Sequence, residues 1–420
     1  MTPIRQGIFE KTDLANGITV VTEKMPHVRS VCIGVWVPTG SRYEKPEQNG
    51  ISHFLEHMFF KGTEKRSALD IAVEVDSLGG EMNAFTSREN TTYYIKVLDE
   101  HQPVAVDILA DIFLHSRFDE AELEKERHVI LEEIRMQDDQ PEDHVHDVIN
   151  EVIWPDQPIG FPVAGREASV SAIGRSDLVD YVTTMYTKNR IVVACAGHVD
   201  HDRIVADVAR GFEGFAGKKD PAAFPQPRYK AGREVLTKKL EQVHLCLALP
   251  GIPVNHPDRF AYYVLNTTLG SNMSSRLFQE VREKRGLAYS VYSYLAGFSN
   301  GGSLTIYAGA SRQKIDEVIT VIREQLRQLA ANPITDAELA RAKAYMKGGL
   351  ILSLESSSSV MSRLAKQELY FDAYETIEET VAKIDRVTAA KVQEMAAESF
   401  QESQLAAAAI GPVDQDELNL

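Results

Sequence analysis

Two histidines and a glutamate lie close together in the stretch His53-Phe-Leu-Glu-His57. If this stretch is helical, His53 and His57 are four residues apart, so both imidazoles project from one side, one turn apart. Glu56 lies about 60° around the helix from His53, close enough to reach a ligand that both histidines hold. Neutral imidazoles suit zinc, and a carboxylate beside a zinc-activated water suits hydrolysis. The stretch therefore indicates a catalytic zinc site.

Apolar residues around this motif predict the helix that would carry it. They recur at the spacing of one helical face, at Ile51, Phe54, Leu55, Met58 and Phe59. A helix that packs by this face presents His53, Glu56 and His57 to a cavity or to solvent. The alternative interpretation is a chance pair of surface histidines beside a glutamate.

A second helical segment supplies candidates for a third ligand. Residues 126–134 read Glu-Arg-His-Val-Ile-Leu-Glu-Glu-Ile, and Glu133 lies 76 positions after His57. Seven residues are close to two helical turns, so Glu126 and Glu133 share one side of this helix. Glu132 points about 100° away from Glu133, and we expect it to be solvated.

The two segments together resemble the pitrilysin-type (M16) metallopeptidases, which include insulin-degrading enzyme and the mitochondrial processing peptidase. The resemblance implies that His53, His57 and Glu133 hold one Zn²⁺ per chain, with Glu56 as the general base. The preference for Glu133 over Glu132 rests mainly on this family's spacing. Glu126 matches a second acidic residue of the family, seven positions before the third ligand, and is counted here among the catalytic residues.

Length and composition limit the remaining possibilities. A chain of 420 residues is too long for one ordinary core, so two domains are expected. Hydrophobic residues make up 44% and charged residues 25%, which is typical of a soluble globular protein. No apolar run approaches the ~18 residues needed to span a bilayer, and the first residues lack a secretory or transit pattern. We therefore expect a cytoplasmic protein that does not bind membranes.

The charged residues and the cysteines argue against two further kinds of function, nucleic-acid binding and zinc binding by cysteine. A formal net charge of −16 argues against nucleic-acid binding. It is compatible with the attraction of basic peptides, or it serves solubility alone. Cys32, Cys195 and Cys246 are widely spaced and lie in apolar runs, which favours buried reduced thiols rather than zinc ligands.

The order of expected elements occurs twice along the chain. We expect a catalytic metal-binding domain at 1–216, a Gly- and Pro-rich linker at 217–230, and a degenerate peptidase-like domain at 231–420. The resemblance implies an α+β fold of two duplicated domains, each a mainly antiparallel sheet packed with helices, together forming half of a clamshell. A two-domain chain of this length resembles the short subfamily, in which two chains enclose the chamber.

Two segments resemble substrate-binding elements of the family. Asn83, Ala84, Phe85 and Thr86 match the edge strand that pairs with the peptide, although an ordinary strand after a Gly-Gly turn is the alternative. An extended peptide held by main-chain hydrogen bonds presents its backbone whatever its sequence. Arg282 and Tyr289, seven positions apart, match the catalytic contacts that the second domain contributes. The alternative interpretation of this segment is the end of an amphipathic helix followed by a strand.

The sequence therefore predicts a zinc endopeptidase that cleaves unfolded or extended peptides. A homodimer is expected, because both parts of the site occur in one chain; a heterodimer with a related subunit is the alternative. Two other classes of protein stay open: a catalytically inactive partner subunit that binds peptides, and a structural-zinc protein.

A second pair of histidines is a weaker candidate for metal binding. His144 and His146 are two residues apart, so on a helix their side chains point in different directions, and we expect both to be surface residues.

Overall fold

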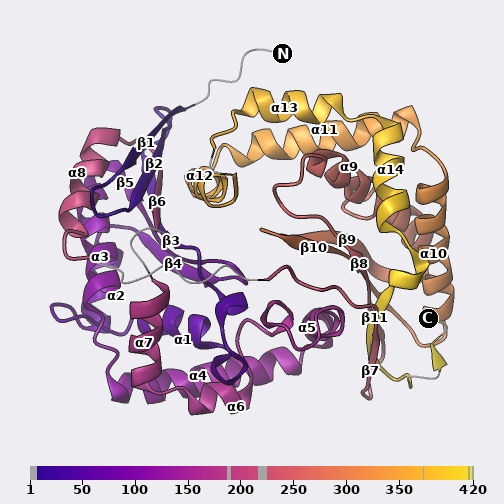
Figure 1. Cartoon of the computed structure of the whole chain (residues 1–420), viewed down its shortest axis with the longest axis horizontal. Helices are drawn as coiled ribbons and strands as arrows, with labels where there is room; N and C mark the ends of the chain where they lie inside the picture. Colours follow the sequence, from indigo (N-terminus) through magenta and orange to yellow (C-terminus); the bar gives the residue numbers. More distant parts are fainter. Residues whose placement is uncertain (1–6, 187–190, 216–224, 372, 415–416, 419–420) are drawn as a thin grey trace. The chain divides into compact units, whose positions relative to one another are not determined.

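The computed structural model describes residues 7–186, 191–215, 225–371, 373–414 and 417–418, which form two compact units (Figure 1). The first unit comprises Met1–Ile134, Pro162–Phe224 and Leu352–Glu375, and the second comprises Arg135–Phe161, Pro225–Ile351 and Thr376–Leu420. Each unit contains one β-sheet packed with helices, which confirms the expected α+β class. Within the described residues, no helix is long and apolar enough to cross a membrane.

The first unit contains a six-stranded sheet with the strand order β1-β2-β6-β3-β5-β4. Its strands are β1 (Ile8–Asp13), β2 (Thr19–Lys24), β3 (Ser30–Val37), β4 (Glu81–Thr86), β5 (Thr91–Leu98) and β6 (Val192–Gly197). β2 and β6 are parallel, and the other neighbouring pairs are antiparallel. β4 is an edge strand, as expected, so one row of its backbone groups has no neighbouring strand in this sheet.

The second unit repeats this topology. Its strands are β7 (Arg233–Thr237), β8 (Val243–Pro250), β9 (Ala288–Phe298), β10 (Gly301–Ala310) and β11 (Ala406–Gly411). They lie in the order β7-β11-β8-β10-β9, with β7 parallel to β11 and the other pairs antiparallel. This is the order and direction of β2-β6-β3-β5-β4 in the first unit. The duplication expected from the order of elements is therefore present, with β1 as an addition to the first sheet.

Helices cover both faces of the first sheet. The helices of this unit are α1 (Ile51–Met58), α2 (Ala68–Ser77), α3 (Gln102–His115), α4 (Glu120–Asp138), α6 (Glu167–Ala172), α7 (Arg175–Met185), α8 (His201–Gly211) and α12 (Ser357–Phe371). Short 3₁₀ turns lie at Ser41–Tyr43, Pro46–Gln48 and Asp99–His101. The apolar faces of α1, α3 and α8 share one buried cluster with the sheet, whereas α12 lies on the opposite face (Figure 1).

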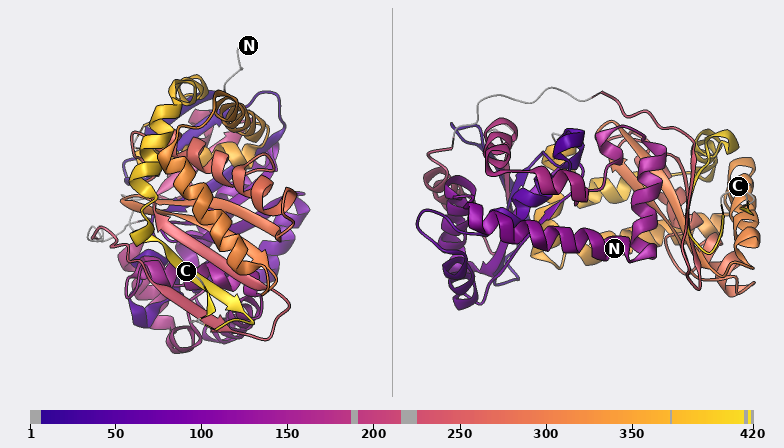
Figure 2. Two further views of the ribbon diagram at one scale, coloured as in Figure 1. Left: turned by 90° about the vertical axis from the view of Figure 1, so that its right-hand side faces the viewer. Right: turned by 90° about the horizontal axis from the view of Figure 1, so that it is seen from below.

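The second sheet is covered in the same way. The helices of this unit are α5 (Pro141–Ile153), α9 (Arg259–Leu269), the π-helix η6 (Phe278–Glu283), α10 (Ile315–Ala331), α11 (Asp336–Ser353), α13 (Ile377–Arg386) and α14 (Ala389–Ser399). Short 3₁₀ turns lie at Pro158–Gly160 and Glu402–Gln404. α9, α10 and α14 pack on one face, and the left-hand view of Figure 2 shows α10 and α14 in front of the sheet. α5 packs on the other face.

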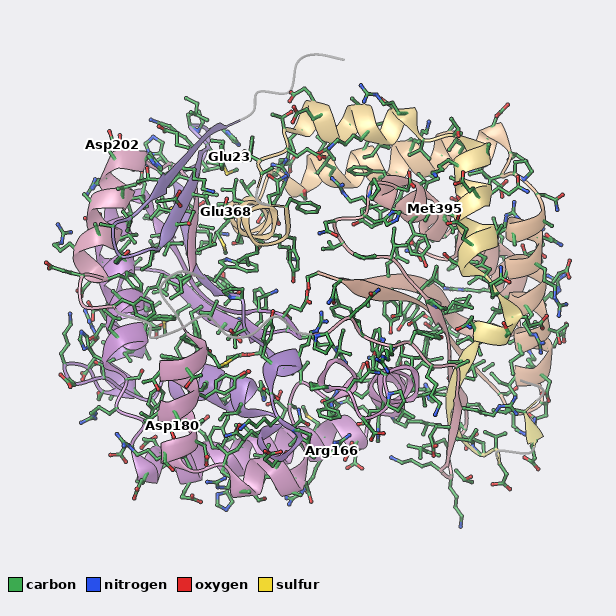
Figure 3. All side chains as sticks on the ribbon, in the orientation of Figure 1. Glu23, Arg166, Asp180, Asp202, Glu368 and Met395 are labelled. Atoms are coloured by element: carbon green, nitrogen blue, oxygen red, sulfur yellow. The ribbon has the colours of Figure 1, made fainter. Side chains whose placement is uncertain are left out.

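Each sheet receives one covering helix from the other half of the sequence. Val145, Ile149 and Ile153 of α5 are buried against β8 and β11 of the second sheet. α12 packs on the first sheet, where Glu368, labelled in Figure 3, pairs with Lys11 of β1 at 2.6 Å. The expected domains, 1–216 and 231–420, would place α5 in the first domain and α12 in the second. In the structure, each of these helices belongs to the other unit. Of the expected linker, 217–224 lies outside the described residues, and 225–230 forms neither helix nor strand.

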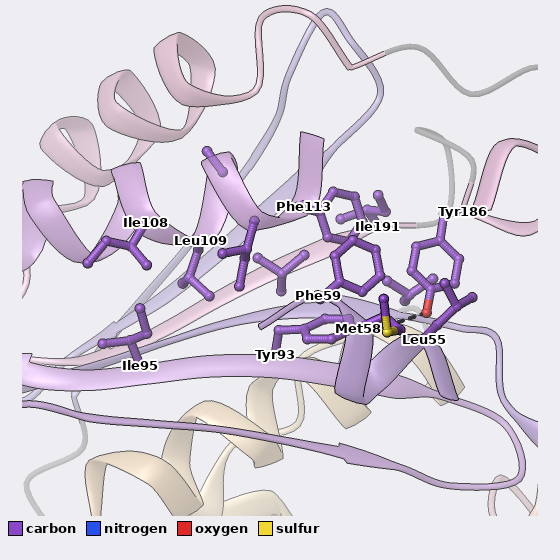
Figure 4. Packing of buried hydrophobic residues seen from close by; sticks show 14 of the residues in the cluster. Leu55, Met58, Phe59, Tyr93, Ile95, Ile108, Leu109, Phe113, Tyr186 and Ile191 are labelled. Atoms are coloured by element: carbon purple, nitrogen blue, oxygen red, sulfur yellow. Dashed lines mark hydrogen bonds between the residues drawn. The ribbon is translucent and has the colours of Figure 1, made fainter. Parts of the chain in front are cut away.

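Aromatic side chains fill the space between α1 and α3. The ring of Phe59 lies 4.8 Å from that of Tyr93 and 5.7 Å from that of Phe113. Tyr186 stacks on both phenylalanines, and its hydroxyl is 3.1 Å from that of Tyr93 (Figure 4). Large rings of this kind resist displacement because each buries a large apolar area. They hold the apolar side of α1 firmly against the first unit's core.

Candidate metal centre

Helix α1 places the histidine motif with its apolar side in the core. Ile51, Phe54 and Leu55 are fully buried, and Met58 is 1% exposed, so the predicted apolar face is confirmed. Gly50 precedes the helix with a φ of 96°, a conformation that side chains disfavour. A Cβ atom at Gly50 would lie 2.7 Å from the carbonyl oxygen of Ala164. A glycine is therefore required where the chain enters α1.

A buried carboxylate caps the beginning of α1. Oε2 of Glu44 accepts from the backbone N–H of Gly50 at 2.7 Å, and Oε1 accepts from that of Ser52 at 2.9 Å. The Asn49 side chain also donates to Oε2, at 3.0 Å. Burial raises the pKa of Glu44 to about 7, although these N–H donors lower it. Glu44 satisfies backbone donors that a helix start leaves free, and so fixes the position of α1.

Three side chains converge on one point. Nε2 of His53 lies 3.7 Å from Oε1 of Glu133, and Nε2 of His57 lies 3.7 Å from Oε2 of the same carboxylate. The two imidazole rings are 4.8 Å apart and nearly perpendicular. Among the described residues, His53, His57 and Glu133 form the only group of three such donors able to surround one ion. Glu132, one position earlier on α4, is exposed.

The donor set fits a zinc ion. Tetrahedral zinc with bonds of about 2.0–2.1 Å separates its ligand atoms by roughly 3.4 Å, close to the distances between these donors. Burial and, to a lesser degree, the neighbouring His57 lower the pKa of His53 to about 4, so the imidazole is neutral and can donate a lone pair. The three cysteines are free and buried, and none belongs to the group. Among the residues that the structure describes, two imidazoles and one carboxylate are the three candidate ligands, so a tetrahedral zinc ion would keep a fourth position for another ligand.

Glu126 lies behind His57. Its Oε2 is 3.0 Å from Nδ1 of His57, on the side of the ring away from Glu133, and its Oε1 is 2.7 Å from the Lys61 ammonium. A carboxylate in this place fixes the orientation and tautomer of a histidine whose other nitrogen binds metal. Nδ1 of His53 is buried with no hydrogen-bond partner among the described residues, so packing alone orients that ring.

Glu56 is held by the edge strand. Oγ1 of Thr86, the last residue of β4, donates to Oε2 of Glu56 at 2.6 Å. Burial raises the pKa of Glu56, whereas the Thr86 hydroxyl and the charge of His57 lower it. The carboxylate is partly buried and lies on the same helix as the two histidines, as a general base for this site would.

The expected substrate strand is the edge of the first sheet. Phe85 turns its ring toward Trp36, with the centroids 5.4 Å apart, and is partly buried. Asn83 is exposed, and its Oδ1 accepts from the backbone N–H of Ala84 at 2.8 Å. Ala84 therefore does not use this donor within the sheet.

Arg282 and Tyr289 belong to the second unit, where they contact each other. Arg282 lies in the π-helix η6, and its guanidinium is 4.9 Å from the Tyr289 ring and 4.8 Å from the Phe278 ring. Tyr289, near the beginning of the edge strand β9, is 78% exposed. Its hydroxyl is thus available to a ligand, and Arg282 is held between two aromatic rings.

Sequence reasoning missed two of these residues, Glu44 and Lys61, and one hydrogen bond. Glu44, Lys61 and the bond from Thr86 to Glu56 depend on tertiary contacts that no local spacing signals. The surface position expected for His146 is wrong. It is partly buried, with Nδ1 2.8 Å from the Tyr294 hydroxyl and Nε2 3.0 Å from that of Tyr292.

Comparison with known proteins identifies the relatives of this chain. The family model described as Insulinase (Peptidase family M16) matches residues 19–167, and that of the Peptidase M16 inactive domain matches residues 172–346. The "Uncharacterized zinc protease YmxG" of Bacillus subtilis is 45% identical over 92% of this chain and 94% of its own length. An uncharacterized zinc protease of Streptomyces coelicolor is 43% identical over 93% of this chain and 87% of its own.

Solved structures share the fold. A protease from Helicobacter pylori superimposes with a TM-score of 0.91 at 23% identity, covering 96% of this chain and 99% of that protein. A peptidase M16 inactive domain from Pseudomonas fluorescens also gives 0.91, at 19% identity, covering 97% of this chain and 98% of that one. The histidine and glutamate donors, the repeated topology and these matches lead to one conclusion: this chain belongs to the M16 family of zinc peptidases, in its short two-domain form.

Proposed function

We propose that this protein is a zinc-dependent endopeptidase that cleaves unfolded or extended peptides. The observation that carries the proposal is the convergence of His53 and His57 on Glu133, with Glu56 on the same helix as both histidines. His53, His57 and Glu133 would hold one zinc ion per chain. Zinc in such a site polarises a carbonyl and makes a water molecule a nucleophile at neutral pH.

The protein's own groups would then move the proton. Glu56 accepts the proton from the attacking water and delivers it to the nitrogen of the leaving amine. The Thr86 hydroxyl holds one carboxylate oxygen of Glu56 at 2.6 Å, which leaves the other oxygen for this transfer. In this proposal, Glu126 orients His57 and takes no direct part in the chemistry. It would therefore be a positioning residue, rather than one of the catalytic residues expected from the sequence.

The free edge of β4 supports extended peptides as substrates. A peptide that adds to this edge would be held by main-chain hydrogen bonds, so its backbone would be recognised whatever its side chains. Asn83, Ala84, Phe85 and Thr86 would form this docking strand. The net charge of −16 is consistent with the attraction of basic peptides.

The second domain would supply the remaining contacts. Arg282 and the exposed Tyr289 hydroxyl can stabilise the negative charge that develops on a carbonyl under attack. In this proposal, 1–216 is the catalytic domain and 231–420 provides these substrate contacts. Because one chain carries both sets of residues, a homodimer is proposed.

A catalytically inactive subunit that binds peptides is the alternative. The words "inactive domain" describe the family that matches residues 172–346, whereas the metal donors lie in the part matched by the peptidase family itself. The intact donor set and Glu56 favour the active enzyme.

Cleavage of unstructured peptides by the pure protein tests the proposal. We expect mass spectrometry to find internal cuts that disappear with a chelator and return when zinc is added. Glu56→Gln protein, purified in the same way, controls for a contaminating protease and is expected to make no cuts. Peptide binding without cleavage by the zinc-loaded protein would establish the inactive subunit instead.

A further inference from the structure

One hydrogen bond joins the edge strand of the first sheet to the proposed general base. Oγ1 of Thr86 donates to Oε2 of Glu56 at 2.6 Å, a length typical of a hydroxyl that donates to a carboxylate. The side chain of Thr86 therefore holds one carboxylate oxygen of Glu56.

The side of β4 on which Thr86 lies follows from the register of the strand. In an antiparallel edge strand, every second residue turns its backbone groups away from the neighbouring strand. The N–H of Ala84 donates to Asn83 and not to β5, and Thr86 lies two residues further along, so by the same alternation its backbone groups also point away from β5. Both residues therefore face the free edge, where an incoming peptide would pair.

We propose that Thr86 is the positioning residue for Glu56, so that the strand that receives the peptide also orients the base. This inference rests on the proposed function. Threonine is β-branched and its χ1 is restricted, so the backbone of β4 fixes the direction of the hydroxyl. With Oε2 held by Thr86, the other carboxylate oxygen is the one left for proton transfer. A peptide that pairs with β4 would hold the same strand end in place.

Two substitutions at Thr86 distinguish a role in orienting Glu56 from a role in maintaining the fold. Thr86→Val keeps the size and branching of the side chain but removes the hydroxyl, whereas Thr86→Ser keeps the hydroxyl. We expect kcat to fall about 10- to 100-fold in Thr86→Val, with KM within about threefold of wild type, because the base is misplaced and peptide docking is not. Thr86→Ser restores most of kcat, and both variants bind zinc as the wild type does.

Thr91→Val is the matched control. Thr91 lies opposite Thr86 in the register of β4 and β5, and its hydroxyl donates to the carbonyl of Thr39 at 2.9 Å, away from Glu56. Its substitution removes a comparable hydrogen bond from the same sheet. An equal loss of kcat in Thr91→Val and Thr86→Val would overturn the proposal, as would wild-type kcat in Thr86→Val.

A second measurement does not depend on catalysis. A double-mutant cycle in the metal-free protein combines Thr86→Val with Glu56→Met, which removes the acceptor, and follows urea unfolding. We expect each single substitution to lower the unfolding midpoint and the second to add little to the first. Strict additivity would overturn the proposal. If the wild type cleaved no peptide, the proposed function would fail, while this cycle would still report whether Thr86 holds Glu56.

Discussion

Oε2 of Glu126 lies 3.0 Å from Nδ1 of His57, while Nε2 of the same ring faces Glu133 at 3.7 Å. The two nitrogens therefore have different partners, and a neutral His57 that donates from Nδ1 presents a lone pair at Nε2. Glu126 sets the tautomer that a metal ligand needs.

Removal of Glu126 is expected to weaken zinc binding without abolishing it. Glu126→Ala leaves His57 in place but frees its ring to rotate, and loss of such a partner commonly costs about 10–100-fold in metal affinity. Competition with a chromophoric zinc chelator measures the change. Glu132→Ala, an exposed position on the same helix, serves as the control. Equal affinities in the two variants would show that Glu126 has no part in holding the metal.

The edge of β4 can be tested with proline. Ala84→Pro removes the backbone N–H that now donates to Asn83, so the change costs the sheet no ladder bond. We expect cleavage of every peptide to fall, whatever its sequence, with zinc content unchanged. Ala84→Gly keeps the donor and is the control in the same steady-state assay. Wild-type rates for Ala84→Pro would mean that peptides do not dock on this strand.

The contribution of the second domain is tested at Arg282 and Tyr289. Tyr289→Phe keeps the ring beside Arg282 and removes only the hydroxyl, and Arg282→Ala removes the guanidinium. Both variants are expected to keep zinc and fold but to lose most peptide hydrolysis, because transition-state charge is less well stabilised. Arg285, which pairs with Glu280 in the same segment, provides the control Arg285→Ala. Normal kinetics in both test variants would limit the second domain to a structural role.

Glu44 predicts a pH dependence of stability. Burial raises its pKa to about 7 in the folded protein, above the ordinary value of 4.5, so the folded state binds more protons between these values. The contribution of Glu44 to the free energy of unfolding therefore falls as pH rises from 4.5 to 7, by at most about 3.5 kcal/mol at roughly 1.4 kcal/mol per pKa unit. Urea unfolding of metal-free protein at several pH values measures this slope. Glu44→Gln is expected to show a shallower slope than the wild type, and identical slopes would contradict the assignment.

The metal helix could be predicted from the sequence because its signals are local. The apolar spacing around His53 and His57 sets which side of α1 is buried, and the structure buries that side. Residues 17–38 and 82–98 also carry local signals, because they alternate or are rich in β-branched and aromatic residues, a pattern that predicts the strands found there as β2, β3, β4 and β5. The third ligand came from the family resemblance, because 76 residues separate Glu133 from His57 and no periodicity spans that distance.

Other features had no local signal. β11, with the sequence Ala-Ala-Ala-Ala-Ile-Gly, lies inside the second sheet although alanine favours helices. The apolar faces of α5 and α12 show that each helix is buried on one side, but not which sheet each covers. The surface position predicted for His146 is wrong because its partners, Tyr292 and Tyr294, lie far away in the sequence and give no local signal.

The central claim, that three side chains hold zinc while Glu56 moves the proton, is tested most directly by zinc content and peptide cleavage measured together on Glu56→Gln. The amide cannot accept or deliver the proton, so turnover is expected to fall about 10²–10⁴-fold while bound zinc stays at the wild-type level. Glu133→Ala, measured alongside, is expected to lose the metal. A Glu56→Gln protein without zinc, or one that cleaves peptides at the wild-type rate, would contradict the account.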